Sequence, residues 1–157
     1  MSRDERFNEA AVRLGHAFDG EIKIGGNYVP VARHGDQVFV SGQIPRVGDT
    51  VVVTGAVGAE VSLAQARVAA SICVMRALAL LKRSLGSLDS IAGIMRVTVY
   101  VQSAPAFTQQ SEVADAASDL LVEVLGPAGA HTRTSVGVLQ LPKSASVEID
   151  LIATVSS

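Results

Sequence analysis

The sequence predicts an α+β fold in two layers, in which a mostly antiparallel sheet is packed by two helices. Residues 94–102 alternate apolar and polar side chains with the period of two that marks a strand with one buried face, and two more such strands fall between residues 131 and 155. Residues 62–85 and 109–125 instead repeat apolar side chains with the helical period of 3.6. Helices that connect strands of one sheet pack on its face, which gives the two layers.

Residues 1–25 are predicted to form an N-terminal extension, and residues 26–157 the main domain. Apolar residues at helical spacing over 4–14 predict a short amphipathic helix, which Gly15 can end in the left-handed conformation. The rest of the extension has the character of a linker. We expect the extension to serve packing or an interface.

A hairpin is predicted next, with strands at 28–32 and 37–41. The tetrapeptide Arg33-His34-Gly35-Asp36 between them has the composition of a tight turn, so His34 is expected in solvent. The valine run 51–53 that follows is a candidate edge strand.

The long helix begins at Ser62, whose side chain can form a capping box with Gln65, and Gly86 can end it. Its apolar stripe is wide enough to lie across a sheet. Four basic residues are expected on its solvent face: Arg67, Arg76, Lys82 and Arg83. The single cysteine of the chain, Cys73, lies in this apolar stretch and is expected to be a small buried hydrophobe.

The two C-terminal strands are predicted to form a hairpin around a turn at residues 141–143. Val136 and Val138 are expected to face the core, which puts Arg133 on the opposite face at the start of its strand. Two interpretations of Arg133 are open. Its guanidinium can bind a planar carboxylate through two parallel hydrogen bonds, or it can form an ordinary ion pair at the protein surface.

Composition excludes several classes of protein. Hydrophobic residues make up 48% of the 157 residues and charged residues only 18%. These values rule out a mostly disordered chain and suggest that another subunit covers part of the apolar surface. The net charge is −2, with four Phe, two Tyr and no Trp. No nucleic-acid partner is expected, because the chain has neither a basic stripe nor a set of stacking aromatic residues.

The numbers and spacing of cysteine and histidine argue against an intrachain disulfide and a metal site. One cysteine cannot form an intrachain disulfide, and the three histidines lack metal-ligand spacing, so no metal is expected. The first residues lack the apolar core of a signal peptide, and the longest apolar run is interrupted by Arg76 and Lys82, so no membrane partner is expected. A reducing cytoplasm fits these features.

Two blocks of the sequence resemble the RidA family (YjgF/YER057c/UK114), in the family's order and over roughly residues 27–155. The matching residues are Tyr28, Val40-Ser-Gly-Gln-Ile-Pro45, Val97-Thr-Val-Tyr-Val101 with Phe107, Arg133-Thr-Ser-Val136, Leu141-Pro142 and Val147-Glu148-Ile149. The chain departs from the family at Ser135, where cysteine is common, and at Pro105, where asparagine is common. It also carries the extension that shorter members lack, and so looks like a longer branch.

The resemblance implies the chorismate-mutase-like version of the fold, assembled as a homotrimer with clefts between subunits. It also implies hydrolysis of reactive 2-imino or enamine acids to 2-oxo acids and ammonia, with no cofactor. Arg133 would hold the substrate carboxylate, and Glu148 would position water or move a proton. The residues expected to line the pocket are Tyr28, Ser41, Gly42 and Ser135.

Two other functions remain open. A module of the same fold could bind a carboxylate metabolite without catalysis, which the departures at Ser135 and Pro105 favour. An endoribonuclease or translation inhibitor is the third hypothesis, a label of the family that the composition does not support. The predicted hairpin does not join Arg133 to Glu148, because its turn puts Arg133 opposite residue 153. A cleft between subunits would let the two residues meet.

Overall fold

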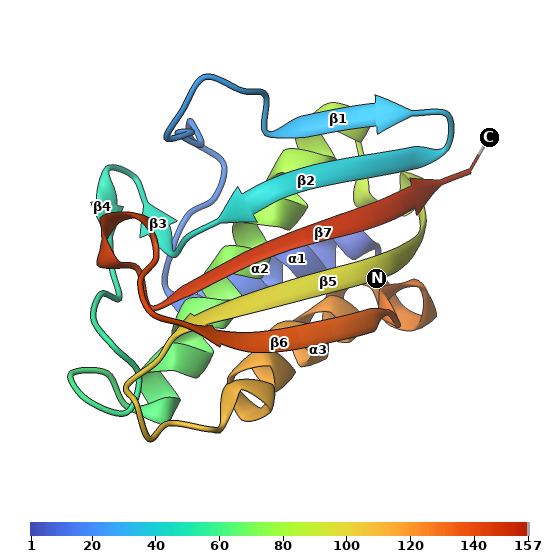
Figure 1. Ribbon diagram of the computed structural model, residues 1–157. Coiled ribbons are helices and arrows are strands. Elements are labelled where there is room, and N and C mark those ends of the chain that lie inside the picture. The colour runs from blue at the N-terminus through green and yellow to red at the C-terminus, as the bar shows by residue number, and fades with distance from the viewer. Residues whose placement is uncertain (157) are drawn as a thin grey trace.

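The computed structural model describes residues 1–156, which form a five-stranded sheet with helices packed on one face. In Figure 1 the helices lie behind the sheet and its other face is bare. In chain order the elements are α1 (Arg3–Leu14), β1 (Val31–His34), β2 (Gln37–Gln43), β3 (Arg46–Val47), β4 (Thr50–Val51), α2 (Leu63–Leu85), β5 (Ile91–Gln102), α3 (Gln110–Leu125), β6 (Thr132–Val138) and β7 (Val147–Val155). The predicted two-layer α+β fold is confirmed.

The strand order of the sheet is β1-β2-β7-β5-β6. Neighbouring strands are antiparallel except β5 and β6, which run parallel, so the sheet is mixed. The hairpin predicted for the two C-terminal strands is wrong, because β5 lies between them. Helix α3 carries the chain back to the start of β5, and β6 then runs beside β5 as a parallel edge strand. The chain next crosses the end of β5, with a short helical turn at Pro142–Ser144, and pairs as β7 on its other side.

The same topology decides which face of β6 is covered. Val97 of β5 is fully buried under the helices, and Arg133 is its partner in register. Arg133 and Ser135 therefore face the helix layer, whereas Val136 faces the bare side and is 40% exposed. The prediction that Val136 and Val138 face the core is wrong. Alternation shows that a strand has two faces, but the crossover connection decides which of them the helices cover.

Helix α2 is the core helix of the fold. Its capping box is confirmed: Gln65 N donates to Ser62 Oγ at 3.1 Å, and Ser62 N donates to Gln65 Oε1 at 2.9 Å. Gly86 ends it with φ of 87°. The helix is long and apolar enough to cross a membrane by composition alone, but 67% of its most apolar window is buried inside the fold, as in a core helix. Arg76, expected in solvent, is also buried.

The N-terminal extension packs directly on the domain. Phe7 of α1 and Phe18 are buried in the main core and contact each other edge to face. Arg3 donates to the backbone oxygens of Leu88 and Ile91 at 3.1 and 2.6 Å, which fixes α1 at the start of β5. Removing α1 would therefore expose core surface, whatever part the extension plays in chemistry.

We expect Phe7→Ala to lower the free energy of unfolding by about 3 kcal/mol, because it empties a buried site of aromatic size. The contact of the Lys82 ammonium with the Phe7 ring, 5.4 Å from the centroid, would be lost as well. Urea unfolding measures the change. Val12→Ala on the exposed side of the same helix is the control and should shift stability by less than about 0.5 kcal/mol. Equal effects of the two changes would show that α1 does not belong to the core.

Candidate functional site

A β-bulge near the end of β2 places Gly42 beneath Glu148. The register of β2 against β7 shifts between Val40 and Gln43, so Ser41 and Gly42 have no partner in the ladder. A Cβ on Gly42 would lie 2.8 Å from Cδ of Glu148 and would overlap its Oε2. Only glycine leaves room for the carboxyl group of Glu148 at this position.

Glu148 lines a cavity of about 240 Å³, which we call the Glu148 cleft. The other lining residues are Lys23, Ile24, Gly25 and Tyr28 before β1, Gly42, Gln43, Ile44 and Arg46 around the end of β2, Arg76 of α2, and Pro142 and Lys143 before β7. The cleft therefore brings together three residues that the sequence singled out, namely Tyr28, Gly42 and Glu148.

The environment of Glu148 favours its protonated form. Burial raises the pKa of this carboxyl group above its ordinary value of 4.5, and the charge of Asp150 raises it further. Burial also raises the pKa of Asp150 itself. A carboxyl group that holds its proton to higher pH can give that proton to a bound molecule and take one back.

The raised pKa of Glu148 predicts a pH-dependent stability. The folded protein binds this proton more tightly than the unfolded chain, so the favourable contribution is complete below pH 4.5 and is lost as pH rises through the folded-state pKa. Glu148→Gln removes this titration and leaves that of Asp150. We therefore expect the Tm of the variant relative to the wild type to be higher at pH 7 than at pH 4. Thermal unfolding across this range checks the prediction, and a constant difference would contradict it.

Ser41 does not line the cleft itself but is hydrogen-bonded to Gln43, which does. The Gln43 amide nitrogen donates to the backbone oxygen of Ser41 at 3.1 Å and to its Oγ at 3.4 Å. The Gln43 Oε1 in turn accepts a hydrogen bond from Arg76 Nε at 3.1 Å. Ser41 is thus part of the wall that holds Gln43 and Arg76 in place.

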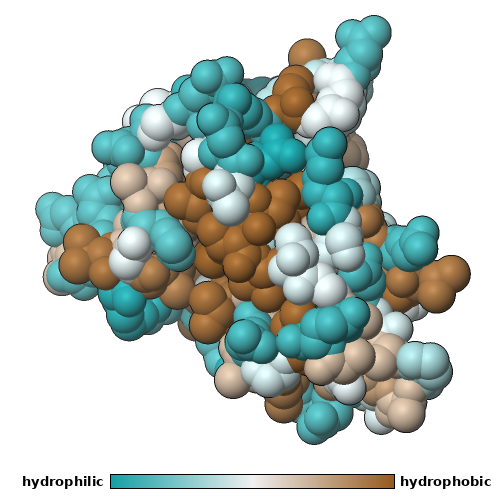
Figure 2. All heavy atoms as spheres, turned by 90° about the vertical axis from the view of Figure 1, so that its left-hand side faces the viewer, coloured by the Kyte–Doolittle hydropathy of each residue, from teal (hydrophilic) through white to brown (hydrophobic). Residues whose placement is uncertain are grey.

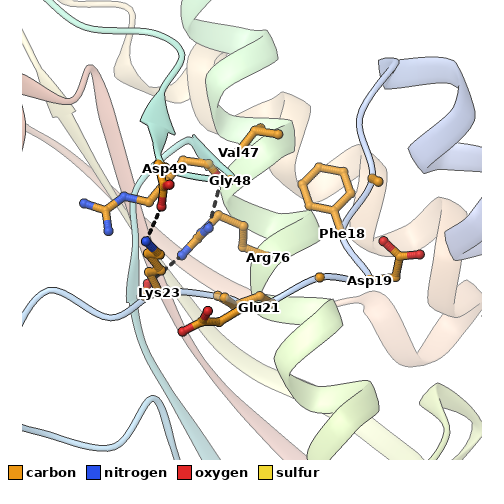
Figure 3. A pocket seen from close by; sticks show the side chains of 12 residues that line it. Phe18, Asp19, Glu21, Lys23, Val47, Gly48, Asp49 and Arg76 are labelled. Carbon is orange, nitrogen blue, oxygen red and sulfur yellow. Dashed lines mark hydrogen bonds and ion pairs between the residues drawn. The ribbon is translucent and has the colours of Figure 1, made fainter.

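Arg76 is the cleft residue that the sequence analysis missed. Its side chain leaves α2 and donates to the backbone oxygens of Arg46 at 2.8 Å and Lys23 at 3.1 Å (Figure 3). Burial lowers the pKa of Arg76, and the charge of Arg46 lowers it further. One signal in the sequence could have found it: Arg76 is the single charged residue in an otherwise apolar stretch of the helix, residues 72–81.

Arg133 lies outside the Glu148 cleft. Its Nη1 donates to Asp115 Oδ1 and to Ser118 Oγ, both at 2.9 Å. Ser118 Oγ also bonds to His131 Nε2 at 2.8 Å. This network fixes the guanidinium of Arg133 against α3, with 21% of its side chain exposed. Within one subunit, Arg133 therefore forms an ion pair with Asp115, as the second of the two interpretations in the sequence analysis expects.

Arg133 and Glu148 lie on opposite faces of the sheet. Arg133 is paired with Val97 and faces the helix layer. Glu148 is paired with Tyr100, which is three residues from Val97 along β5. Because side chains alternate along a strand, Tyr100 and Glu148 face the other side of the sheet. The structure therefore does not bring Arg133 together with Glu148 inside one subunit. Ser135 shares the face of Arg133 and does not line the cleft.

The end of the molecule that carries β3, β4 and the turn before β7 is partly apolar. Figure 2 views this end, which is on the left in Figure 1, and shows apolar side chains at its centre ringed by hydrophilic ones. Tyr28 and Val52 are among the exposed large apolar residues of the chain, at 48% and 40%. Apolar patches with a polar rim are typical of surfaces that contact another protein or a ligand.

The chain offers neither an exposed thiol nor a metal site within its described part. Cys73 is fully buried, as predicted, and burial raises its pKa strongly, so its thiol is not a nucleophile. Among residues 1–156, no group of three or more His, Cys, Asp and Glu side chains could hold a metal ion.

Comparison with known proteins places the fold in a family. The chain matches the family described as "YjgF/chorismate_mutase-like, putative endoribonuclease" over residues 11–154. Protein TCP17 of Trypanosoma cruzi is 36% identical over 146 residues, which cover 92% of this chain and 91% of TCP17. The match includes the second half of the extension as well as the main domain.

Solved structures agree with this assignment. The protein Atu1372 of Agrobacterium tumefaciens is 36% identical, with a TM-score of 0.87 over 99% of this chain and 95% of that one. A putative endoribonuclease of Shewanella oneidensis MR-1 is 26% identical, with a TM-score of 0.90 over 99% and 100%. TdcF of E. coli, solved with bound serine, is 26% identical, with a TM-score of 0.63 over 90% and 97%.

The match to the family spans most of the described chain, and TCP17 is similar over nearly its whole length. The chain therefore belongs to the YjgF/chorismate-mutase-like family and has its α+β fold.

Proposed function

We propose that the protein hydrolyses 2-imino or enamine acids to 2-oxo acids and ammonia in the Glu148 cleft, without a cofactor. The observation that carries the proposal is the carboxyl group of Glu148, held over Gly42 in a cavity of small-molecule size and with a raised pKa. The relative TdcF supports it, because the solved structure of that protein holds serine, a small molecule with an α-carboxylate.

The chemistry needs one proton-transfer group and a fixed substrate. Water attacks the carbon of the C=N bond, a C–O bond forms, and the π electrons move to nitrogen, which is protonated. The tetrahedral intermediate then collapses to C=O as ammonia leaves with a further proton. In this scheme Glu148 protonates the nitrogen and takes a proton from the attacking water. Tyr28 lines the same cavity and helps to orient the substrate.

Arg133 is proposed to bind the substrate carboxylate from a neighbouring subunit. It cannot reach Glu148 within its own subunit, because the sheet separates them. Its ion pair with Asp115 holds the guanidinium in place, and Nη2 donates to Ser111 O at 3.4 Å. A planar carboxylate fits the remaining donors. This arrangement needs the homotrimer that the family resemblance implies. We propose the cytoplasm as the location of the protein.

We expect the protein to be a homotrimer at micromolar concentration. The bare face of the sheet exposes Phe39 and Val136 at 41% and 40%, and the end of the molecule in Figure 2 has an apolar centre. Contact with other subunits would bury such surfaces. Light scattering on the purified protein should give three times the mass of the 16.3 kDa chain. A monomer mass would contradict the proposal of a site between subunits.

The proposed activity can be tested directly. An amino-acid oxidase generates imines from several amino acids, and their decay is followed with and without the protein. We expect faster decay and a matching release of 2-oxo acid and ammonia. Decay at the uncatalysed rate, combined with binding of 2-oxo acids, would instead favour a non-catalytic carboxylate-binding module. Ser135 and Pro105 replace common family residues and are the observation that favours this alternative.

A further inference from the structure

Neither Arg76 nor Arg46 forms an ion pair among residues 1–156, although Arg46 lies near enough to Asp49 to add to the lowering of its pKa by Lys23. Arg76 is 5% exposed, and its three hydrogen bonds go to neutral oxygens, those of Gln43, Arg46 and Lys23. Nε of Arg46 is shielded from solvent and lacks a hydrogen-bond partner within residues 1–156. Buried charges and buried donors in proteins normally have partners, which makes this pair of arginines a candidate site for an anion.

Both arginines line two adjoining cavities. One is the Glu148 cleft, and the other, of about 390 Å³, lies under the extension between Phe18 and Asp49 (Figure 3). Lys23 also lines both cavities but is already paired with Asp49. The two arginines are therefore the cations that line both cavities without an ion pair among residues 1–156, and Lys143 adds a further positive charge to the Glu148 cleft alone.

Arg76 also has a structural contribution. Its guanidinium ties α2 to the extension through Lys23 O and to the chain at Arg46 through the backbone oxygen there. Neutral acceptors satisfy only part of its five N–H donors and leave its charge without a counter-ion. The Arg46 side chain makes no hydrogen bond within the described residues that would tie two segments together. Its charge lies close enough to Arg76 to lower the pKa of Arg76. Two like charges held together at the wall of a cleft lower their repulsion by binding an anion.

We propose that Arg46 and Arg76 bind a second carboxylate of the substrate, which makes the preferred substrates 2-imino dicarboxylates, the imines of acidic amino acids. This inference rests on the proposed function for the identity of the reacting group. The binding of the second carboxylate, however, can be measured without any reaction.

Calorimetric titration of the full-length protein with three stable probes tests the proposal. 2-Oxoglutarate carries two carboxylates, 2-oxopentanoate has the same chain length with one, and inorganic phosphate reports on free anions. We expect 2-oxoglutarate to bind at least about tenfold more tightly than 2-oxopentanoate, as a charge-assisted pair of hydrogen bonds predicts. Equal affinities would overturn the proposal, as would phosphate binding as tightly as 2-oxoglutarate.

Arg46→Gln is the decisive variant, because it removes the charge and keeps the backbone oxygen that accepts from Arg76. It should reduce the affinity for 2-oxoglutarate to that for 2-oxopentanoate and leave the latter unchanged. Arg33→Gln is the matched control: Arg33 is exposed on β1, bonds only within its own turn, and loses the same charge. An equal loss in both variants would reveal a general charge effect and overturn the assignment, as would wild-type affinity in Arg46→Gln.

The same titration separates this inference from the proposed function. A preference for 2-oxoglutarate that depends on Arg46, without faster imine decay, would support the anion site and refute the hydrolysis. Faster imine decay with equal affinity for the two oxo acids would support the hydrolysis and refute the anion site.

Discussion

Arg133→Ala is expected to abolish imine hydrolysis and to weaken binding of the α-carboxylate more than a hundredfold. Loss of a charge-assisted bidentate pair corresponds to about 3 kcal/mol or more. Arg133→Lys should not restore the activity, because an ammonium cannot form the planar two-bond fork. Imine decay and calorimetric binding of 2-oxopentanoate measure both effects. The fold should persist, since Arg133 lies at the edge strand and is partly exposed.

Asp115→Ala separates the two interpretations of Arg133. If Arg133 only forms a surface ion pair, both variants lose the same contact, and each should lower the Tm slightly and leave activity unaltered. If Arg133 binds substrate, Asp115→Ala should keep most of the binding that Arg133→Ala loses. Wild-type imine decay in Arg133→Ala would remove Arg133 from the proposed site.

Gly42→Ala is expected to reduce the activity about a hundredfold or more. The new methyl group would overlap Oε2 of Glu148 and lie 2.8 Å from its Cδ, so the carboxyl group must leave its position in the cleft. Displacement of a proton-transfer group by about 1 Å has effects of this size. The measurement is kcat for imine hydrolysis, together with the pH profile that the raised pKa of Glu148 shapes.

Gly25→Ala provides a matched control for Gly42→Ala. Gly25 lines the same cleft, and a Cβ there would meet no atom within 4 Å. The same chemical change should therefore leave kcat nearly unaltered. Similar losses in the two variants would mean that the cleft tolerates no added methyl group, and displacement of Glu148 would not be the cause of the loss in Gly42→Ala.

Much of the fold could be predicted from local sequence. The capping box at Ser62, the helix end at Gly86 and the alternation around Val97 depend on neighbours within a few residues, and the structure confirms them. The pairing of the C-terminal strands depends on the crossover through α3, which no local pattern encodes. The sequence therefore predicted a hairpin where β5 separates the two strands.

The candidate site was predictable only in part for the same reason. Gly42 and Glu148 were found through a family resemblance, and the bulge that joins them is a matter of register between β2 and β7. Arg76 was predicted to face solvent. The segments that cover it, around Lys23 and Arg46, have no periodic pattern, so the sequence did not show that they pack on this part of α2. Arg133 faces the helix layer because of the crossover from β5 to β6, and the alternation along its strand could not show which face that would be.

Mixed trimers test most directly the claim that Arg133 of one subunit acts with Glu148 of the next. Arg133→Ala and Glu148→Gln, each inactive alone, are unfolded, mixed in equal amounts and refolded together, with each variant refolded separately as the control. In a cyclic trimer, random assembly gives about a quarter of the sites both intact residues. We predict recovery of about that fraction of wild-type imine hydrolysis in the mixture. No activity in mixed trimers whose assembly is verified by mass would contradict a site shared between subunits.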